Sequence, residues 1–190
     1  MQQRSFTRAL GDLVEEYEKV ALVTLVATAI MGGSALASAA ETQVERGKYL
    51  VTITSCNDCH TPGYFLGKPD FSRTLAGSEV GFAIPGVGVF VGRNLTPDKE
   101  TGLGDWTDEQ IISAITAGVR PDGRGLAPIM PWKGLSHLSQ DDARAIVAYL
   151  RSLPPTKNAV PGPFGPNEVP SSLVFVIVPG EVYAKMPAPK

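Results

Sequence analysis

Apolar residues recur at helical spacing in three segments of this chain, which predicts helices over residues 42–54, 107–118 and 139–153. Gly47 lies inside the first of these helices. A glycine in a helix costs about 1 kcal/mol relative to alanine, so its presence usually has a packing reason. We therefore expect another helix to lie close to Gly47, and the helix over residues 139–153 is the candidate partner.

Polar residues and prolines mark the ends of the two later helices. Thr107 and Gln110 have the spacing of a capping box, in which each side chain satisfies a free amide of the first turn. Ser139 is a good N-cap for the last predicted helix. Pro154 and Pro155 follow that helix, and they stop it because proline cannot continue the hydrogen-bond pattern.

The segment between the first two helices is rich in glycine. Residues 61–106 contain nine glycines, which predicts a long irregular loop. Within it, residues 79–84 and 87–91 have the composition of two short strands. Pro85 and Gly86 stand between them, and proline followed by glycine suits the centre of a type II turn. The sequence therefore predicts a small β-hairpin inside the loop.

The composition changes again after the last predicted helix. Residues 158–190 contain seven prolines and an isolated apolar run over residues 173–178. That run is too short to span a membrane. Two interpretations fit it: a strand packed back on the domain, or a docking surface for another subunit. We divide the chain into a leader of residues 1–40, a domain of residues 41–157 and a Pro-rich extension of residues 158–190.

The leader has the pattern of a secretory signal. Residues 20–31 are uncharged and mostly apolar, and small residues follow as far as Ala39 and Ala40, where an A-x-A cleavage site fits. The acidic residues before the apolar run depart from the usual basic start. The alternative is an uncleaved anchor, because residues 20–40 carry no charge. Under either interpretation we expect a periplasmic protein, soluble or anchored to the cytoplasmic membrane.

Length and charge narrow the class of protein further. The 190 residues suffice for one domain with appendages, and 43 % hydrophobic with 19 % charged residues is ordinary for a globular protein. The net charge of −2 gives no electrostatic reason to expect nucleic-acid binding.

The segment Cys56-Asn57-Asp58-Cys59-His60 holds both cysteines of the chain. A C-x-x-C-H string indicates a c-type haem attachment site. Each thiol adds to a haem vinyl group, and the histidine that follows is placed to ligate the iron. The motif predicts one covalently bound haem c, with Cys56 and Cys59 as thioether anchors and His60 as an axial ligand.

Two other kinds of site also contain a C-x-x-C pair. A thioredoxin-like redox site would sit near a βαβ pattern, and the sequence shows none. A zinc site needs two further Cys or His ligands, and only His137 remains. Both are therefore weaker than the haem interpretation.

Met130 is the candidate for the second axial ligand. Two prolines restrict the backbone around it, and it lies between two predicted helices. Methionine sulfur would close the iron site and raise its reduction potential. The alternative use of Met130 is to fill a gap in the core. Met186, in the Pro-rich extension, and His137, which reads as a surface imidazole, are weaker candidates.

Five short motifs occur in order along residues 43–157. They are Arg46-Gly47-Lys48-Tyr49-Leu50, Cys56-Asn57-Asp58-Cys59-His60, Asn94-Leu95-Thr96-Pro97-Asp98, Gly104-Asp105-Trp106-Thr107-Asp108-Glu109-Gln110 and Pro128-Ile129-Met130-Pro131-Trp132. The set resembles class I c-type cytochromes. In particular it is similar to the haem domains of bacterial cytochrome subunits that serve alcohol, gluconate and related dehydrogenases.

The resemblance implies an all-α class I cytochrome c fold, with crossed first and last helices around the Gly-rich loop and its small hairpin. It implies axial ligation of the haem iron by His60 and Met130. It also implies electron transfer from a dehydrogenase toward the respiratory chain, so the chain is expected to be an electron carrier and not itself an enzyme. Such subunits often carry three haem domains. The single motif here favours a mono-haem carrier or a small accessory subunit.

Two further residues are candidates for haem contacts. Arg93 precedes the Asn94 turn, where its guanidinium would pair with a haem propionate or else remain solvated. Trp132 would pack on the porphyrin or donate its N–H to a propionate.

Two alternative functions stay open at this stage. An open sixth position on the iron would suit a peroxidase-like enzyme or a gas sensor. The extension of residues 158–190 would also suit an assembly subunit of a dehydrogenase complex.

Overall fold

The structure is a computed structural model that describes residues 42–186. The chain divides into two units, Met1–Thr42 and Gln43–Lys190, and apart from Thr42 all residues described below belong to the second. The predicted signal or anchor over residues 1–40 lies outside the described residues. Within the described part, no helix has both the length and the apolar character needed to cross a membrane.

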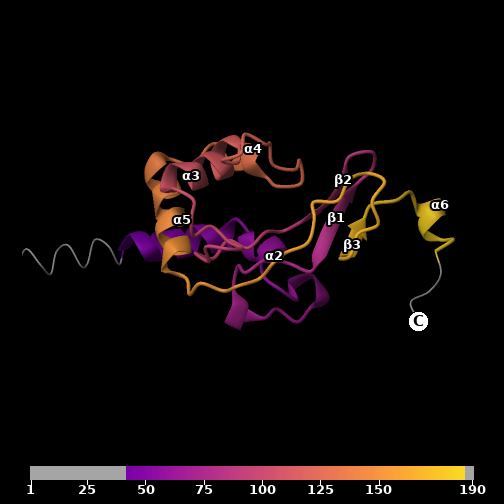
Figure 1. Ribbon diagram of the computed structural model, residues 1–190, viewed down its shortest axis with the longest axis horizontal. Coiled ribbons are helices and arrows are strands. Elements are labelled where there is room, and N and C mark those ends of the chain that lie inside the picture. The colour runs from indigo at the N-terminus through magenta and orange to yellow at the C-terminus, as the bar shows by residue number, and fades with distance from the viewer. Residues whose placement is uncertain (1–41, 187–190) are drawn as a thin grey trace, which may run out of the picture. The chain divides into compact units, whose positions relative to one another are not determined.

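The second unit combines helices with a small sheet (Figure 1). The chain is helical over residues 42–53 and then forms, in order, α2 (Cys56–His60), the 3-10 turns η1 (Tyr64–Leu66) and η2 (Phe71–Arg73), β1 (Val80–Ile84), β2 (Gly88–Val91), α3 (Asp108–Ala117), α4 (Trp132–Leu135), α5 (Gln140–Ser152), β3 (Leu173–Val176) and α6 (Gly180–Tyr183).

The three helices expected from the apolar pattern are confirmed, with ends that differ by at most one residue. The capping box at the start of α3 is complete: the Thr107 hydroxyl accepts from the Gln110 amide at 3.2 Å, and the Gln110 side chain accepts from the Thr107 amide at 2.9 Å. α3 ends at Gly118, whose φ of 70° is left-handed. At the start of α5 the Ser139 hydroxyl accepts from the Asp142 amide at 3.0 Å.

The close packing expected at Gly47 is also confirmed. A Cβ at Gly47 would lie 1.9 Å from the Ala145 carbonyl oxygen and 2.8 Å from the Tyr149 Cβ, so the N-terminal helix of residues 42–53 approaches α5 to backbone contact. Around this contact the two helices and α3 share one apolar core, in which Val51, Ile111 and Ile146 are nearly inaccessible to solvent. This core gives the segments that flank the haem motif a fixed support.

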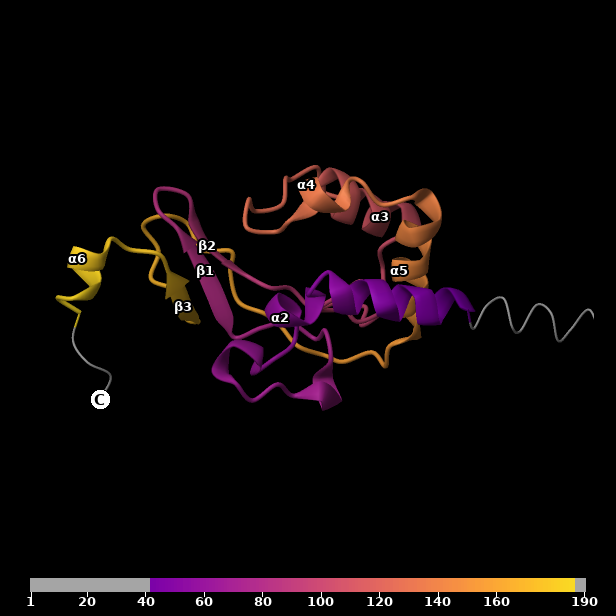
Figure 2. The same ribbon diagram turned by 180° about the vertical axis from the view of Figure 1, so that it is seen from behind.

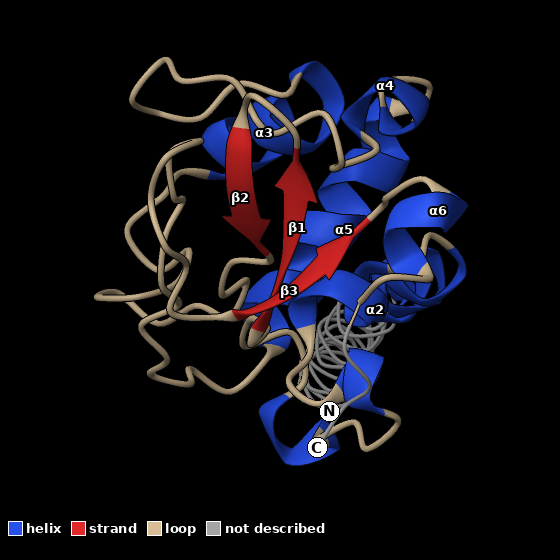
Figure 3. Ribbon diagram, turned by 90° about the vertical axis from the view of Figure 1, so that its right-hand side faces the viewer, coloured by secondary structure: helices blue, strands red, loops and turns tan. Residues whose placement is uncertain are grey.

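The all-α expectation is wrong. β1 and β2 form the expected hairpin, whose turn is closed by a 2.9 Å hydrogen bond from the Val87 amide to the Ile84 carbonyl, with Gly86 at φ 76°. β3 adds to it in parallel with β1, from Val80 opposite Leu173 to Ala83 opposite Val176, giving a three-stranded mixed sheet in the order β2-β1-β3 (Figure 3).

The physical reason for the error lies in the extension. The resemblance covers residues 43–157, whereas β3 lies beyond them and completes its backbone hydrogen bonds along the free edge of the hairpin. For the apolar run over residues 173–178, the strand interpretation is therefore confirmed. The predicted helix over residues 139–153 is present as α5, but it is not the last helix of the chain, because α6 follows it in the extension.

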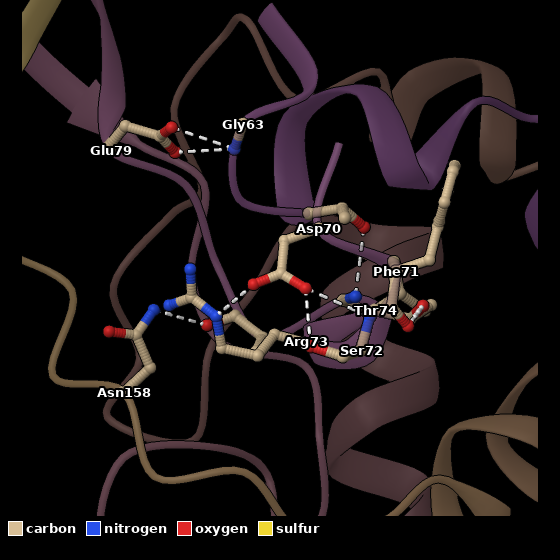
Figure 4. Close-up of polar contacts among 11 residues, drawn as sticks. Gly63, Asp70, Phe71, Ser72, Arg73, Thr74, Glu79 and Asn158 are labelled. Carbon is tan, nitrogen blue, oxygen red and sulfur yellow. Dashed lines mark hydrogen bonds and ion pairs between the residues drawn. The ribbon is translucent and has the colours of Figure 1, made fainter. Parts of the chain in front are cut away.

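The extension contacts the Gly-rich loop as well as the sheet. The side-chain amide of Asn158 donates to the Ala76 carbonyl at 2.7 Å, and Figure 4 shows this side chain beside Arg73. In the same view the Glu79 carboxylate accepts from the Gly63 amide, at 2.8 and 3.1 Å. These bonds hold the loop that follows the haem motif against the start of β1. The division into three regions at residues 40 and 157 stays a prediction.

Candidate haem-binding site

The C-x-x-C-H motif forms a short helix of its own. Ser55 has a left-handed φ of 57° and separates α2 from the helix of residues 42–53. The spacing of three residues between Cys56 and Cys59 brings both side chains to the same side of one helical turn. Both thiols are free and half-buried, and the Sγ of Cys56 lies 3.3 Å from the Thr54 hydroxyl. One flat group could therefore reach both sulfurs at once.

The environment of the two thiols argues against the other interpretations of the pair. Burial raises the pKa of both Cys56 and Cys59, whereas a thioredoxin-like pair needs a lowered pKa to hold a reactive thiolate. For zinc, no group of three or more Cys, His, Asp or Glu side chains within residues 42–186 is arranged to hold a metal ion. Haem attachment is the chemistry that remains for two neutral thiols beside a histidine.

His60 is held by one hydrogen bond to the backbone. Its Nδ1 lies 2.7 Å from the Arg93 carbonyl oxygen. Because a carbonyl only accepts, Nδ1 carries the proton and Nε2 keeps a free lone pair. Burial lowers the pKa of His60, which favours the neutral ring that a metal ligand must have. Histidines that bind a metal almost always donate their other ring N–H in this way, to a carboxylate, a backbone carbonyl or a water molecule.

Gly92 allows the backbone to come this close to α2. A Cβ there would lie 1.7 Å from the Cys59 carbonyl oxygen. The Gly77 amide donates to the His60 carbonyl at 2.7 Å, and the Ser78 amide donates to the Gly92 carbonyl at 2.9 Å. α2 and the segment after β2 are thus joined into one unit. Gly92 was not singled out from the sequence, where it is one of nine glycines in residues 61–106.

Met130 lies in the loop between α3 and α4. Its amide donates to the Ala127 carbonyl at 3.0 Å, its carbonyl accepts from the Trp132 amide at 2.8 Å, and its side chain is half-buried. α4 lies above α2 in all three ribbon views (Figures 1, 2 and 3). Met186 is 45 % exposed and His137 is exposed. Met130 as the second axial ligand stays a prediction.

Arg93 and Trp132, the other predicted haem contacts, both have partners within the protein. The Arg93 guanidinium donates to the carbonyls of Val160 and Gly162 in the extension. The Trp132 ring lies against Gly118, where a Cβ would come within 2.6 Å of ring atoms. A guanidinium has further N–H groups to offer. The propionate and porphyrin contacts of these two residues stay predictions.

Two arginines that the sequence did not single out lie near Arg93. Burial lowers the pKa of Arg93, and the charges of Arg120 and Arg124 lower it further. The Cζ of Arg120 lies over the Trp106 ring, 5.1 Å from its centroid. Its Nε is buried without a hydrogen bond among the described residues, and it forms a looser ion pair with Asp122, whose Oδ2 lies 3.6 Å away. The half-buried guanidinium of Arg120 suits a carboxylate such as a propionate of haem, whereas the exposed Arg124 is bonded to Asp122.

Comparison with known proteins decides the family. Residues 42–150 match the model described as cytochrome c oxidase, cbb3-type, subunit III. The chain belongs to this cytochrome c family. The resemblance to c-type cytochromes is therefore confirmed, and membership indicates a covalently bound haem c.

Several relatives of this cytochrome are cytochrome subunits or multi-haem proteins. It is 31 % identical over 142 residues to the cytochrome c subunit of alcohol dehydrogenase (quinone) from Gluconobacter oxydans, which covers 75 % of this chain and 28 % of that protein. It is 34 % identical over 135 residues to the fructose dehydrogenase cytochrome subunit from Gluconobacter japonicus, covering 67 % and 26 %.

A third relative is a diheme cytochrome c-type protein from Cereibacter sphaeroides, 38 % identical over 118 residues, covering 58 % of this chain and 35 % of that protein. The chain thus spans about a quarter to a third of the length of these three relatives.

Proposed function

We propose that this cytochrome carries single electrons through one haem c, attached at Cys56 and Cys59 and ligated by His60 and Met130. The observation that carries the proposal is the hydrogen bond from His60 Nδ1 to the Arg93 carbonyl, because it leaves Nε2 free and fixes the plane of the ring. The count of one haem rests on the two cysteines in these 190 residues, which suffice for a single attachment.

Each residue has a separate role in this proposal. When bound, the haem iron would supply the exchange between Fe(II) and Fe(III). His60 would hold it through a neutral nitrogen and Met130 through a soft sulfur, which would favour the reduced state and raise the potential. With both ligands in place no substrate would reach the metal, so the chain would transfer electrons and perform no catalysis of its own.

The partner proposed is a dehydrogenase. Two of the relatives above are cytochrome subunits of alcohol and fructose dehydrogenases, and a further relative is a gluconate 2-dehydrogenase cytochrome c subunit. We infer that this chain receives electrons from such an enzyme and delivers them toward the respiratory chain. That role places it in the periplasm, where the leader of residues 1–40 would direct it, either free or held to the membrane through residues 20–40.

Purification from native membranes and periplasm tests the proposal. We expect a protein with one covalently attached haem that co-purifies with a dehydrogenase, and the haem should be reduced when that enzyme receives its substrate. Alcohol, fructose and gluconate, added one at a time, are the first substrates to try. The absorption spectrum reports reduction within each mixing experiment. A chain without covalent haem, or a haem that no substrate of the co-purified enzyme reduces, would contradict the proposal.

A further inference from the structure

Arg93 joins two parts of the molecule that are far apart in sequence. Its carbonyl accepts the His60 Nδ1 proton at 2.7 Å. Its guanidinium donates to the carbonyls of Val160 and Gly162, which follow it by 67 and 69 residues. The backbone of one residue thus holds the proposed axial histidine, and its side chain binds the C-terminal extension.

The extension lies along the segment that contains Arg93. At one end, the Asn94 side chain donates to the Thr156 carbonyl at 2.7 Å. At the other, Phe164 and Val89 exchange two backbone hydrogen bonds of 2.9 and 3.0 Å. Residues 156–164 therefore run beside β2 and the segment that follows it, with the guanidinium of Arg93 bonded between the two ends.

The opposite side of this segment is packed against the haem motif. Gly92 touches α2 so closely that the Cys59 carbonyl oxygen occupies the place of a side chain. Residues 92–94 consequently lie between α2 and the extension. A shift of the extension away from Arg93 would leave the acceptor of the His60 proton supported from one side alone.

We propose that residues 156–164, which lead from the domain into the extension, are a positioning element for the haem, acting through Arg93 to fix the carbonyl that orients His60. The inference rests on the proposed function, since it needs His60 as an axial ligand. Arginine suits this role because its planar guanidinium holds several N–H donors in a fixed geometry and can bind two carbonyls at once. The ammonium group of lysine is a point charge on a flexible stem and does not fix two acceptors in this way. Hydrogen bonds from a charged donor are also stronger than those between neutral groups. They offset the cost of half-burying this cation beside Arg120 and Arg124.

Exchange of the His60 Nδ1 proton with solvent measures this positioning directly. The experiment uses the full haem-loaded chain in its reduced state and follows the proton by NMR. In Arg93→Gln the two bonds to the extension are lost, and exchange should be at least about tenfold faster, because the loss of one such bond already shifts an equilibrium by roughly this factor. Arg93→Lys keeps the charge but not the two-carbonyl geometry, and it should shift exchange in the same direction.

A variant in the extension and a matched control separate positioning from charge. Gly162 has a left-handed φ of 78°, and a Cβ there would lie 2.9 Å from the Phe164 ring. Gly162→Ala therefore displaces the extension while it leaves every charge in place, and exchange should again be faster. Arg124→Gln removes a charge near Arg93 from a side chain that is bonded to Asp122. It should leave the exchange rate unchanged.

The outcomes decide between positioning and simpler accounts. Faster exchange in the Arg93 variants and in Gly162→Ala, with no change in Arg124→Gln, supports the inference. An unchanged rate in Gly162→Ala, or an equal increase in Arg124→Gln, overturns it. If Arg93→Gln fails to fold, Arg93→Lys and Gly162→Ala still decide. A six-coordinate wild-type spectrum with unaltered exchange in the variants would refute this inference alone, whereas loss of that spectrum in the wild type would refute the proposed function.

Discussion

Replacing Met130 with alanine is expected to lower the reduction potential of the haem and to open the sixth position on the iron. The physical reason is the loss of a soft sulfur ligand that favours Fe(II). Axial ligands set haem potentials over a range of about 0.8 V, so the fall should be a substantial part of that range. Equilibrium redox titration of the purified variant measures the fall, and the oxidised absorption spectrum reports the change of ligand.

Met186→Ala is the matched control for this variant. Met186 lies in the extension and is 45 % exposed, so its removal should leave potential and spectrum as in the wild type. An unchanged potential in Met130→Ala would mean that this side chain only fills space near the haem. A changed potential and spectrum in Met186→Ala, with none in Met130→Ala, would instead indicate that Met186 is the axial ligand.

The second large effect is expected at Gly92. In Gly92→Ala the new Cβ would stand 1.7 Å from the Cys59 carbonyl oxygen, and rotation of a side chain cannot relieve a clash with backbone. The segment after β2 must then move away from α2, which also withdraws the acceptor of the His60 proton. We expect the free energy of unfolding of the haem-loaded protein to fall by about 3 kcal/mol. Denaturant titration followed at the haem absorption band measures it.

Gly125→Ala is the control for the effect of adding a methyl group to a glycine. A Cβ at Gly125 would have nothing within 4 Å. This variant should therefore unfold at nearly the wild-type denaturant concentration. Equal stability of Gly92→Ala and Gly125→Ala would show that the segment after β2 adapts without cost, and the close contact with α2 would lose its importance.

Local features of the fold could be predicted because their causes lie within a few residues. The capping box at Thr107 needs only Gln110, and the turn after β1 needs only Pro85 and Gly86. The pairing of β3 with β1 has no such local signal. It joins Val80 to Leu173 through backbone groups that every residue carries, so the apolar run fitted a strand and a docking surface equally well.

The same distinction applies to the haem site. Cys56, Cys59 and His60 form a motif whose spacing alone indicates its chemistry. The acceptor of the His60 proton is the backbone carbonyl of Arg93, whereas the sequence indicated a role only for the Arg93 side chain. The partners of that side chain are backbone carbonyls of the extension. Every residue has such a carbonyl, so the residue types of the extension do not indicate which of them Arg93 binds. Arg120 was missed because a single arginine after a helix usually lies in solvent.

Binding of carbon monoxide to the reduced wild-type protein tests the central claim most directly. The claim is that His60 and Met130 close both axial positions, so that the iron carries electrons and binds no small molecule. The account predicts that the spectrum of the reduced protein does not change when carbon monoxide is added, whereas Met130→Ala binds the gas. Rapid binding of one carbon monoxide per haem in the wild type would contradict the account and favour a peroxidase-like enzyme or a gas sensor.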